Sequence, residues 1–331
     1  MIFDSSKEMG KYHNEKVRLS EDEKDKLRGY RDANLERLRN GLMKNNEPAY
    51  IKSISQGSYA MHTINKHPDN DYDIDVGIIF NREDLKGRQG GDKSALAARH
   101  MVCDAMQDDR FNTPPEVLKN CVRVYYEEGH HVDMPVYRQF EDEDGDVVQE
   151  LASSEWEESD PEAITEWYSD AVIEKSPDTA NGRQMRRVTR LIKKWARSRN
   201  SWNMPSGFII SVLVDEKYIS KEGRDDEALY ETLKAIRNRL SRNKQVRNPV
   251  NDDLISDGKE AQLQKMYEEL DRALNETLNI LEKLDCSHEE AMKAWSKFFN
   301  DDFFKEQIKE SDESQRGYES VSVMTKPWRS S

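Results

Sequence analysis

The chain has 331 residues, enough for one large or two modest domains, and hydrophobic and charged residues each make up 35% of it. Its formal net charge of −14 argues against a broad nucleic-acid-binding or membrane-binding surface, because the field of the whole surface repels polyanions. Three cysteines without a CxxC pair indicate neither a zinc ribbon nor a disulfide framework, and the lack of a long apolar run or signal-peptide pattern predicts a cytoplasmic protein without a membrane span.

The first half of the chain predicts a mixed sheet with helices around it. Residues 20–45 form a long charged helix that opens with the capping-box spacing of Ser20 and Glu23. Strands are predicted at 50–54, 71–80, 122–126 and 131–137, and the 71–80 strand alternates acidic and apolar residues. A turn with a short helix fills 57–66, and a loop followed by a helix fills 83–110.

The second half changes to helical periodicity, with helices predicted at 160–175, 183–200, 205–219, 226–241, 258–284 and 288–300. The pattern as a whole predicts an α+β catalytic core followed by a C-terminal helical domain. We divide the chain into a core with its N-terminal helix at 1–165, a helical domain at 166–310 and a flexible tail at 311–331. The N-terminal helix is expected to run along both domains.

Two aspartates lie two residues apart on the 71–80 strand, Asp73 and Asp75. Side chains at this spacing point the same way, which places the carboxylates about 7 Å apart on one face. Such a pair can hold two divalent ions on a nucleoside triphosphate, and two-metal chemistry usually needs a third carboxylate. Asp133 is the candidate third carboxylate, because a charge without a partner among its apolar neighbours would cost free energy. Asp133 is also a candidate base for the proton of the attacking hydroxyl. Hard oxygen ligands favour Mg²⁺, with Mn²⁺ as a substitute. The alternative is a solvent-facing acidic pair in a chain with 65 acidic residues.

The turn Gln56-Gly57-Ser58 precedes the aspartates. Gly57 lets the backbone approach a phosphate, and Ser58 offers a hydroxyl and an amide where a helix begins. The alternative is an ordinary helix N-cap.

The basic helix at 183–197 carries seven Lys and Arg residues and could hold a triphosphate. Ser206, at the start of the next helix, could add a hydrogen bond. The alternative is a solvated basic face that balances acidic surface elsewhere.

Other polar and aromatic residues carry weaker signals. His130 and His131 precede Asp133, but one of the two must point away on a strand, so we favour packing over metal binding for them. Tyr59, Tyr137 and Trp202 are candidates for stacking on a base.

These motifs together resemble the bacterial cGAS/DncV-like nucleotidyltransferases (CD-NTases) of CBASS anti-phage systems. The resemblance rests on QGSYAMHT at 56–63, DYDIDVG at 71–77 and HVDMP at 131–135. It continues through LIKKW at 191–195, PSG at 205–207, VRNPV at 246–250 and AWSKFF at 294–299, so that it covers about residues 15–305. His62 stands where many members have a small residue, and the zinc-binding insertion of the animal enzymes is missing.

The resemblance implies a polymerase-β-like nucleotidyltransferase core with a helical lid. It implies Asp73, Asp75 and Asp133 as metal ligands. It also implies that the donor triphosphate lies near Gln56, Gly57, Ser58, Lys193 and Ser206. The implied activity is the joining of nucleoside triphosphates into a cyclic di- or trinucleotide, which a separate effector protein receives. No DNA activator is expected, and a monomer is favoured. The alternatives are a transferase that modifies an RNA end or a protein, and a non-catalytic nucleotide sensor on the same fold.

Overall fold

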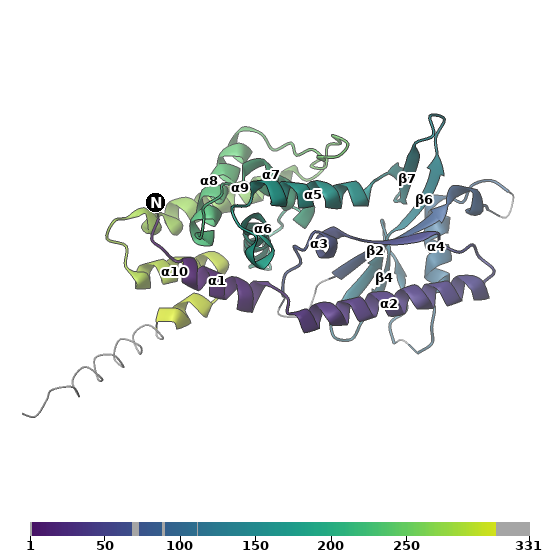
Figure 1. The fold of residues 1–331 in the computed structure, drawn as a ribbon, viewed down its shortest axis with the longest axis horizontal. Coiled ribbons are helices and arrows are strands. Elements are labelled where there is room, and N and C mark those ends of the chain that lie inside the picture. Colours follow the sequence, from purple (N-terminus) through teal and green to yellow (C-terminus); the bar gives the residue numbers. More distant parts are fainter. Residues whose placement is uncertain (1, 68–72, 88–89, 111, 309–331) are drawn as a thin grey trace, which may run out of the picture. The chain divides into compact units, whose positions relative to one another are not determined.

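The computed structural model describes residues 2–67, 73–87, 90–110 and 112–308, and their helices and strands fall into two units (Figure 1). The sheet unit comprises Arg18–Glu174 with Pro249–Asn251. The helical unit comprises Met1–Val17, Lys175–Asn248 and the residues from Asp252 onward. This boundary lies at the end of a helix near 174 instead of at 165, and the first 17 residues belong to the helical unit because they pack on its helices. The proposed tail at 311–331 lies outside the described residues.

In the described residues, one mixed sheet is built from β1 (Lys52–Gln56), β2 (Asp73–Asn81), β3 (Glu116–Val117), β4 (Val122–Tyr125), β5 (His131–Met134), β6 (Val136–Glu141), β7 (Val147–Ala152) and β8 (Trp156–Glu158). β2 pairs antiparallel with β1 and parallel with β5 and β6. β5 and β6 keep one register along β2 on either side of Pro135. Pro135 has no N–H to donate, and its carbonyl accepts a hydrogen bond of 2.8 Å from the Ile78 N–H. The predicted mixed sheet is therefore confirmed, with β3, β7 and β8 as strands that the sequence did not predict.

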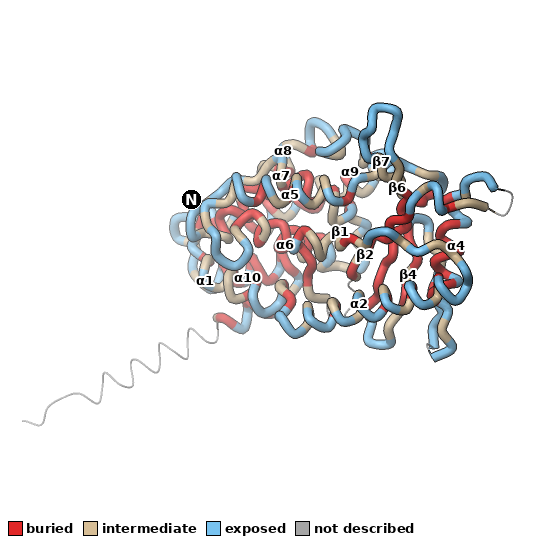
Figure 2. Tube along the Cα trace, turned by 45° about the vertical axis from the view of Figure 1, so that its right-hand side comes forward, coloured by how far each residue is buried: buried red, intermediate tan, exposed pale blue. Residues whose placement is uncertain are grey.

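Two helices, α2 (Glu21–Lys44) and α4 (Ala95–Ala105), pack on each other and against the sheet. The capping box of Ser20 and Glu23 begins α2 as predicted. Gly41 permits the close approach of the two helices, because a Cβ there would lie 1.8 Å from the Ala105 carbonyl oxygen. The core between these helices and the sheet is apolar, and Figure 2 shows much of β2 and β4 buried while the outer face of α2 is exposed. The buried central strands β2 and β5 thus support the side chains that lie on the opposite face of the sheet.

The helix α5 (Pro161–Lys175) follows the sheet, and the helical unit contains α1 (Ser6–Tyr12), α6 (Gln184–Ala196), α7 (Gly207–Lys217), α8 (Asp225–Arg242), α9 (Glu260–Glu276) and α10 (His288–Phe299). α1 continues into a π-helical turn at His13–Val17, and α9 is followed by a 3-10 turn at Leu278–Glu282. Aromatic rings pack between α1 and the C-terminal part of the helical unit. The ring centroid of Tyr12 lies 4.7 Å from the ring centroids of both Phe299 and Phe304. The predicted helical domain is confirmed, apart from α1, which was not predicted.

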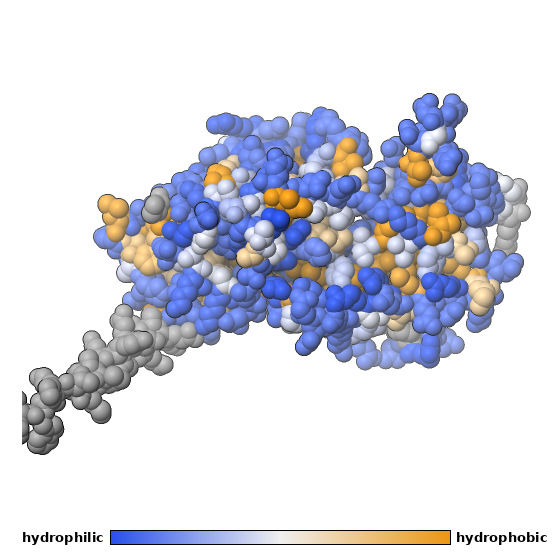
Figure 3. Space-filling view, viewed as in Figure 1, coloured by the Kyte–Doolittle hydropathy of each residue, from blue (hydrophilic) through white to orange (hydrophobic). Residues whose placement is uncertain are grey.

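The surface agrees with the charge-rich composition. Figure 3 shows a face that is mostly hydrophilic, with apolar residues in small separate groups. Within the described residues, no helix combines the length and apolar character that crossing a bilayer requires.

Candidate active site

β2 and β5 carry the three predicted carboxylates. On β2, Asp73 and Asp75 alternate with Ile74 and Val76, which are buried in the core, so the two carboxylates share the opposite face. The parallel register pairs Asp73 with His131 and Asp75 with Asp133. Directly opposite residues of paired strands lie on one face of a sheet, so the structure brings Asp73, Asp75 and Asp133 together although they are about sixty positions apart in sequence.

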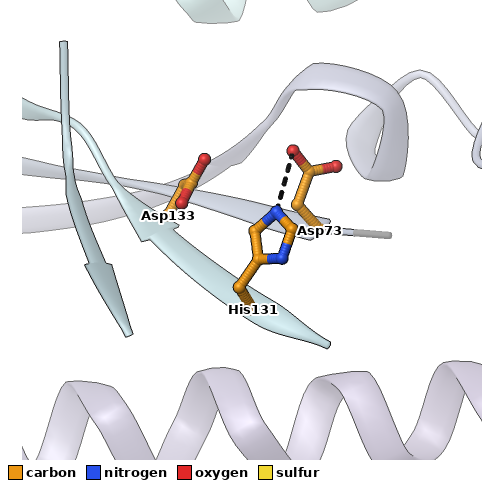
Figure 4. Close-up of side chains that lie close together, drawn as sticks. All are labelled: Asp73, His131 and Asp133. Carbon is orange, nitrogen blue, oxygen red and sulfur yellow. Dashed lines mark ion pairs between the residues drawn. The ribbon is translucent and has the colours of Figure 1, made fainter. Parts of the chain in front are cut away.

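Figure 4 shows the side chains of Asp73, His131 and Asp133 gathered over these two strands. His131 Nε2 lies 3.9 Å from Asp73 Oδ2. One ligand atom from each of the three residues lies within 4.8 Å of the others, which is a separation that one divalent ion can span. We favoured packing for both histidines from sequence. His130 does pack, near the ring of Tyr30, whereas His131 faces the carboxylates.

The pKa of the Asp75 carboxyl is raised. Burial, together with the charges of Asp73 and Asp133, raises its pKa well above the ordinary value of 3.8, and the Arg123 guanidinium partly offsets the effect. The negative charges of these three carboxylates repel one another where water is partly excluded. A bound divalent cation would offset this repulsion. The donor set of carboxylate oxygens and one imidazole therefore fits a divalent metal, with Asp73, Asp75, Asp133 and His131 as the residues that would hold it.

Arg123 contacts Asp133 through a bidentate ion pair. Its Nε and Nη2 donate to Asp133 Oδ1 and Oδ2, each over 2.7 Å. Arg123 lies on β4 directly opposite Asp133 in the antiparallel ladder. The sequence analysis did not single out Arg123, although its place in the alternation Val122-Arg123-Val124 predicts a residue on the same face as the site.

Gly57 lies directly against Asp75. Its φ is +64°, and a Cβ at this position would lie 2.1 Å from Asp75 Oδ2, so both the backbone and the space favour glycine. Ser58 follows within α3 (Gly57–Ala60), a single helical turn. The Oε1 of Gln56 accepts a hydrogen bond of 3.1 Å from the Tyr137 hydroxyl. Tyr137 is only 1% exposed, so the idea that it stacks on a base is wrong.

Lys193 and Ser206 belong to the helical unit and lie close to each other. A Cβ on Gly207, the first residue of α7, would lie 3.4 Å from the Lys193 Nζ. Ser206 caps α7 by accepting from the Ile209 N–H. Lys193 thus places an ammonium group beside the beginning of α7, where anions are favoured.

The basic helix is not a solvated face. Arg187 is buried and donates to Asp178 and Asp225, each over 2.6 Å, and Arg190 lies 3.3 Å from the ring of His13. Arg187 and Arg190 therefore have partners within the helical unit, which gives these two members of the basic cluster a structural role. Lys193 is the member of the cluster that lies beside α7.

Known proteins match this chain across the same elements. Residues 51–137, which run from β1 to the first residues of β6, match the family model for the nucleotidyltransferase domain of cyclic GMP-AMP synthase DncV-like proteins. A curated cyclic GMP-AMP synthase of Escherichia albertii is 28% identical over 211 residues, which cover 61% of this chain and 45% of that protein. The chain thus matches somewhat less than half the length of this relative.

Solved structures share the fold. The apo form of Vibrio cholerae DncV superposes with a TM-score of 0.69 and 17% identity, covering 90% of this chain and 95% of that one. CdnC of E. coli MS115-1, solved with ATP, superposes with a TM-score of 0.66 and 16% identity, covering 91% and 98%. The fold agrees over both units, and the family model matches the segment that carries all three carboxylates. Residues 51–137 are thus similar to the nucleotidyltransferase domain of DncV-like proteins, and the chain shares the fold of the DncV and CdnC structures.

Proposed function

We propose that this protein is a cyclic oligonucleotide synthase, which joins nucleoside triphosphates into a cyclic di- or trinucleotide and releases pyrophosphate. The observation that carries the proposal is the group of Asp73, Asp75 and Asp133 on one face of β2 and β5, within the segment that the family model matches. The solved and curated relatives support the product class. One Vibrio cholerae DncV structure is a cyclic AMP-GMP synthase in complex with the linear intermediate 5′ pppA(3′,5′)pG.

Each transfer is a displacement at an α-phosphorus. A 2′ or 3′ hydroxyl oxygen bonds to the phosphorus, its proton passes to a base, and the bond to pyrophosphate breaks. A second transfer within the linear product closes the ring, or a third does so for a trinucleotide. A bound divalent cation would neutralise phosphate charge and make the hydroxyl more acidic, and Mg²⁺ or Mn²⁺ is the ion we propose.

The chain's own residues orient the reactants. Asp73 and Asp75 would hold the cation that binds the triphosphate, and Gly57 and Ser58, in the turn beside Asp75, are proposed to contact the phosphates. Asp133 is the proposed proton acceptor, and Arg123 donates to both of its oxygens in the metal-free protein. Lys193 and Ser206 are proposed to contact the donor phosphates from the helical unit.

The family resemblance supports a set of finer proposals. The product would activate a separate effector protein in CBASS anti-phage signalling. The synthase would act in the cytoplasm as a monomer and would need no DNA activator, since the sequence lacks the zinc-binding insertion of the animal enzymes.

The test is one incubation of the purified protein with all four nucleoside triphosphates and Mg²⁺ or Mn²⁺, followed by phosphatase treatment and mass spectrometry. We expect a phosphatase-resistant product with the mass of a cyclic di- or trinucleotide. Asp75→Asn should abolish it, and the exposed Asp84→Asn on the same unit serves as the matched control. Full activity of Asp75→Asn would overturn the site. Labelled nucleotide on added RNA or protein, without a cyclic product, would replace the proposal by a transferase with a macromolecular acceptor.

A further inference from the structure

A row of polar residues crosses the sheet on the face of the site. The registers place Asp75 opposite Asp133, Asp133 opposite Arg123, and Arg123 opposite Glu116 on the edge strand β3. Directly opposite residues share a face and have Cβ atoms about 4.5–5.5 Å apart. Arg123 therefore stands between two carboxylates, Asp133 on one side and Glu116 on the other.

The two carboxylates differ in their surroundings. The Asp133 side chain is 8% exposed, and both of its oxygens accept hydrogen bonds from Arg123. Glu116 is exposed and accepts a hydrogen bond of 2.6 Å from the hydroxyl of Tyr125, a neighbour of Arg123 on β4. The Arg123 side chain is 26% exposed, which leaves the guanidinium room to move.

Arg123 and a divalent cation need the same carboxylate. A guanidinium that binds both oxygens of Asp133 uses its preferred bidentate geometry. A cation that binds Asp133 in that region meets the positive charge of Arg123 at short range, and this repulsion is costly where water is partly excluded. Glu116, directly opposite Arg123 on β3, offers the displaced guanidinium a second carboxylate.

We propose that Arg123 is a two-position counter-ion, which holds Asp133 in the metal-free protein and moves toward Glu116 when a divalent cation takes Asp133. The inference rests on the proposed function insofar as Asp133 is a metal ligand. Arg123 acts as a positioning residue. It pairs with the negative charge of Asp133 until the cation binds, and it lowers the cation affinity of the nucleotide-free site. Glu116 acts only through Arg123.

The test measures Mn²⁺ binding to the nucleotide-free full chain by the loss of the free-Mn²⁺ signal in electron paramagnetic resonance. Arg123→Gln should bind Mn²⁺ about tenfold more tightly than the wild type, because a charge-assisted competitor has been removed. Arg123→Lys should lie between the two, since it keeps the charge without the bidentate geometry. Glu116→Gln should bind Mn²⁺ about threefold more weakly, because the displaced guanidinium loses its second partner.

Double variants distinguish an effect of Glu116 that acts through Arg123 from a direct electrostatic effect of Glu116 on the bound cation. Glu116→Gln should change nothing in the Arg123→Gln background, and Arg123→Gln should lose its effect in the Asp133→Asn background. Circular dichroism and thermal melting of each variant confirm the fold. An undiminished Glu116→Gln effect without Arg123, or equal Mn²⁺ affinity of wild type and Arg123→Gln, overturns the inference and leaves the synthase proposal standing. Failure to detect a cyclic product, with these affinity shifts present, overturns the proposed function alone.

Discussion

The contact between Gly57 and Asp75 provides the sharpest prediction about how the turn and the carboxylate site depend on each other. In Gly57→Ala, the new Cβ would lie 2.1 Å from Asp75 Oδ2, at a backbone φ of +64°. The left-handed backbone costs a non-glycine residue roughly 1–2 kcal/mol. Forcing the carboxylate off its rotamer adds about 0.5–1.5 kcal/mol. We therefore expect a loss of roughly 1.5–3.5 kcal/mol in the free energy of unfolding of the sheet unit.

The assay compares Gly57→Ala with Gly145→Ala. Gly145 lies in the same unit at φ +86°, but a Cβ there would have no atom within 4 Å, so this control isolates the contact with Asp75 from the backbone cost. Gly57→Ala should lower the melting temperature by roughly 5–10 °C, and Gly145→Ala by about half of that. A displaced carboxylate should also reduce synthesis by about 100-fold, with Gly145→Ala unaffected. Equal stability and equal activity of the two variants would refute the reasoning.

Three further predictions concern charge and metal. The pKa of Asp75 in the folded metal-free protein is raised above 3.8, so between pH 3.8 and that raised pKa the folded protein binds more protons than the unfolded chain. The free energy of unfolding should therefore fall as pH rises through this window. Denaturant titrations of Asp75→Asn at several pH values should lack that decrease. His131→Asn should weaken Mn²⁺ binding by about tenfold and Mg²⁺ binding much less, because imidazole suits transition metals better; equal losses in calorimetry would argue against ligation by His131. Lys193→Met should weaken nucleoside triphosphate binding by about tenfold in the same assay while the melting temperature stays within about 2 °C, and unchanged binding would remove Lys193 from the phosphate site.

The sequence predicts the parts of the fold that have strong local patterns. The alternation around Asp73 and Asp75, the capping box of α2 and the helical periodicity of the second half all appear in the structure. β3 and β8, at the edges of the sheet, were not predicted because they have only two and three residues, and β7 was not predicted because its apolar residues do not alternate and only Ala152 is buried. Polar edge strands lack the buried stripe by which a strand is recognised in sequence.

The ion-pair partners of charged side chains are harder to predict from sequence than the helices and strands. Seven basic residues in one helix indicate a phosphate site as readily as a structural network, because their partners lie elsewhere in the chain. Asp178 and Asp225, which bind Arg187, are separated from it by 9 and 38 positions. The pairing of Arg123 with Asp133 depends in the same way on the register of two strands, which residue spacing alone does not give.

The site itself depends on that register. A shift of β5 by one residue along β2 would turn Asp133 toward the apolar core and place Val132 on the face of the site, since side chains alternate at every position. The buried side chains of Val132 and Met134 oppose such a shift, because moving them to the other face would remove them from the core. The apolar residues on either side of Asp133 thus fix the position of the carboxylate as firmly as its charged partners do. This explains how a face with several acidic groups remains ordered: the energy that holds Asp73, Asp75 and Asp133 together comes from the opposite, apolar face of the same strands.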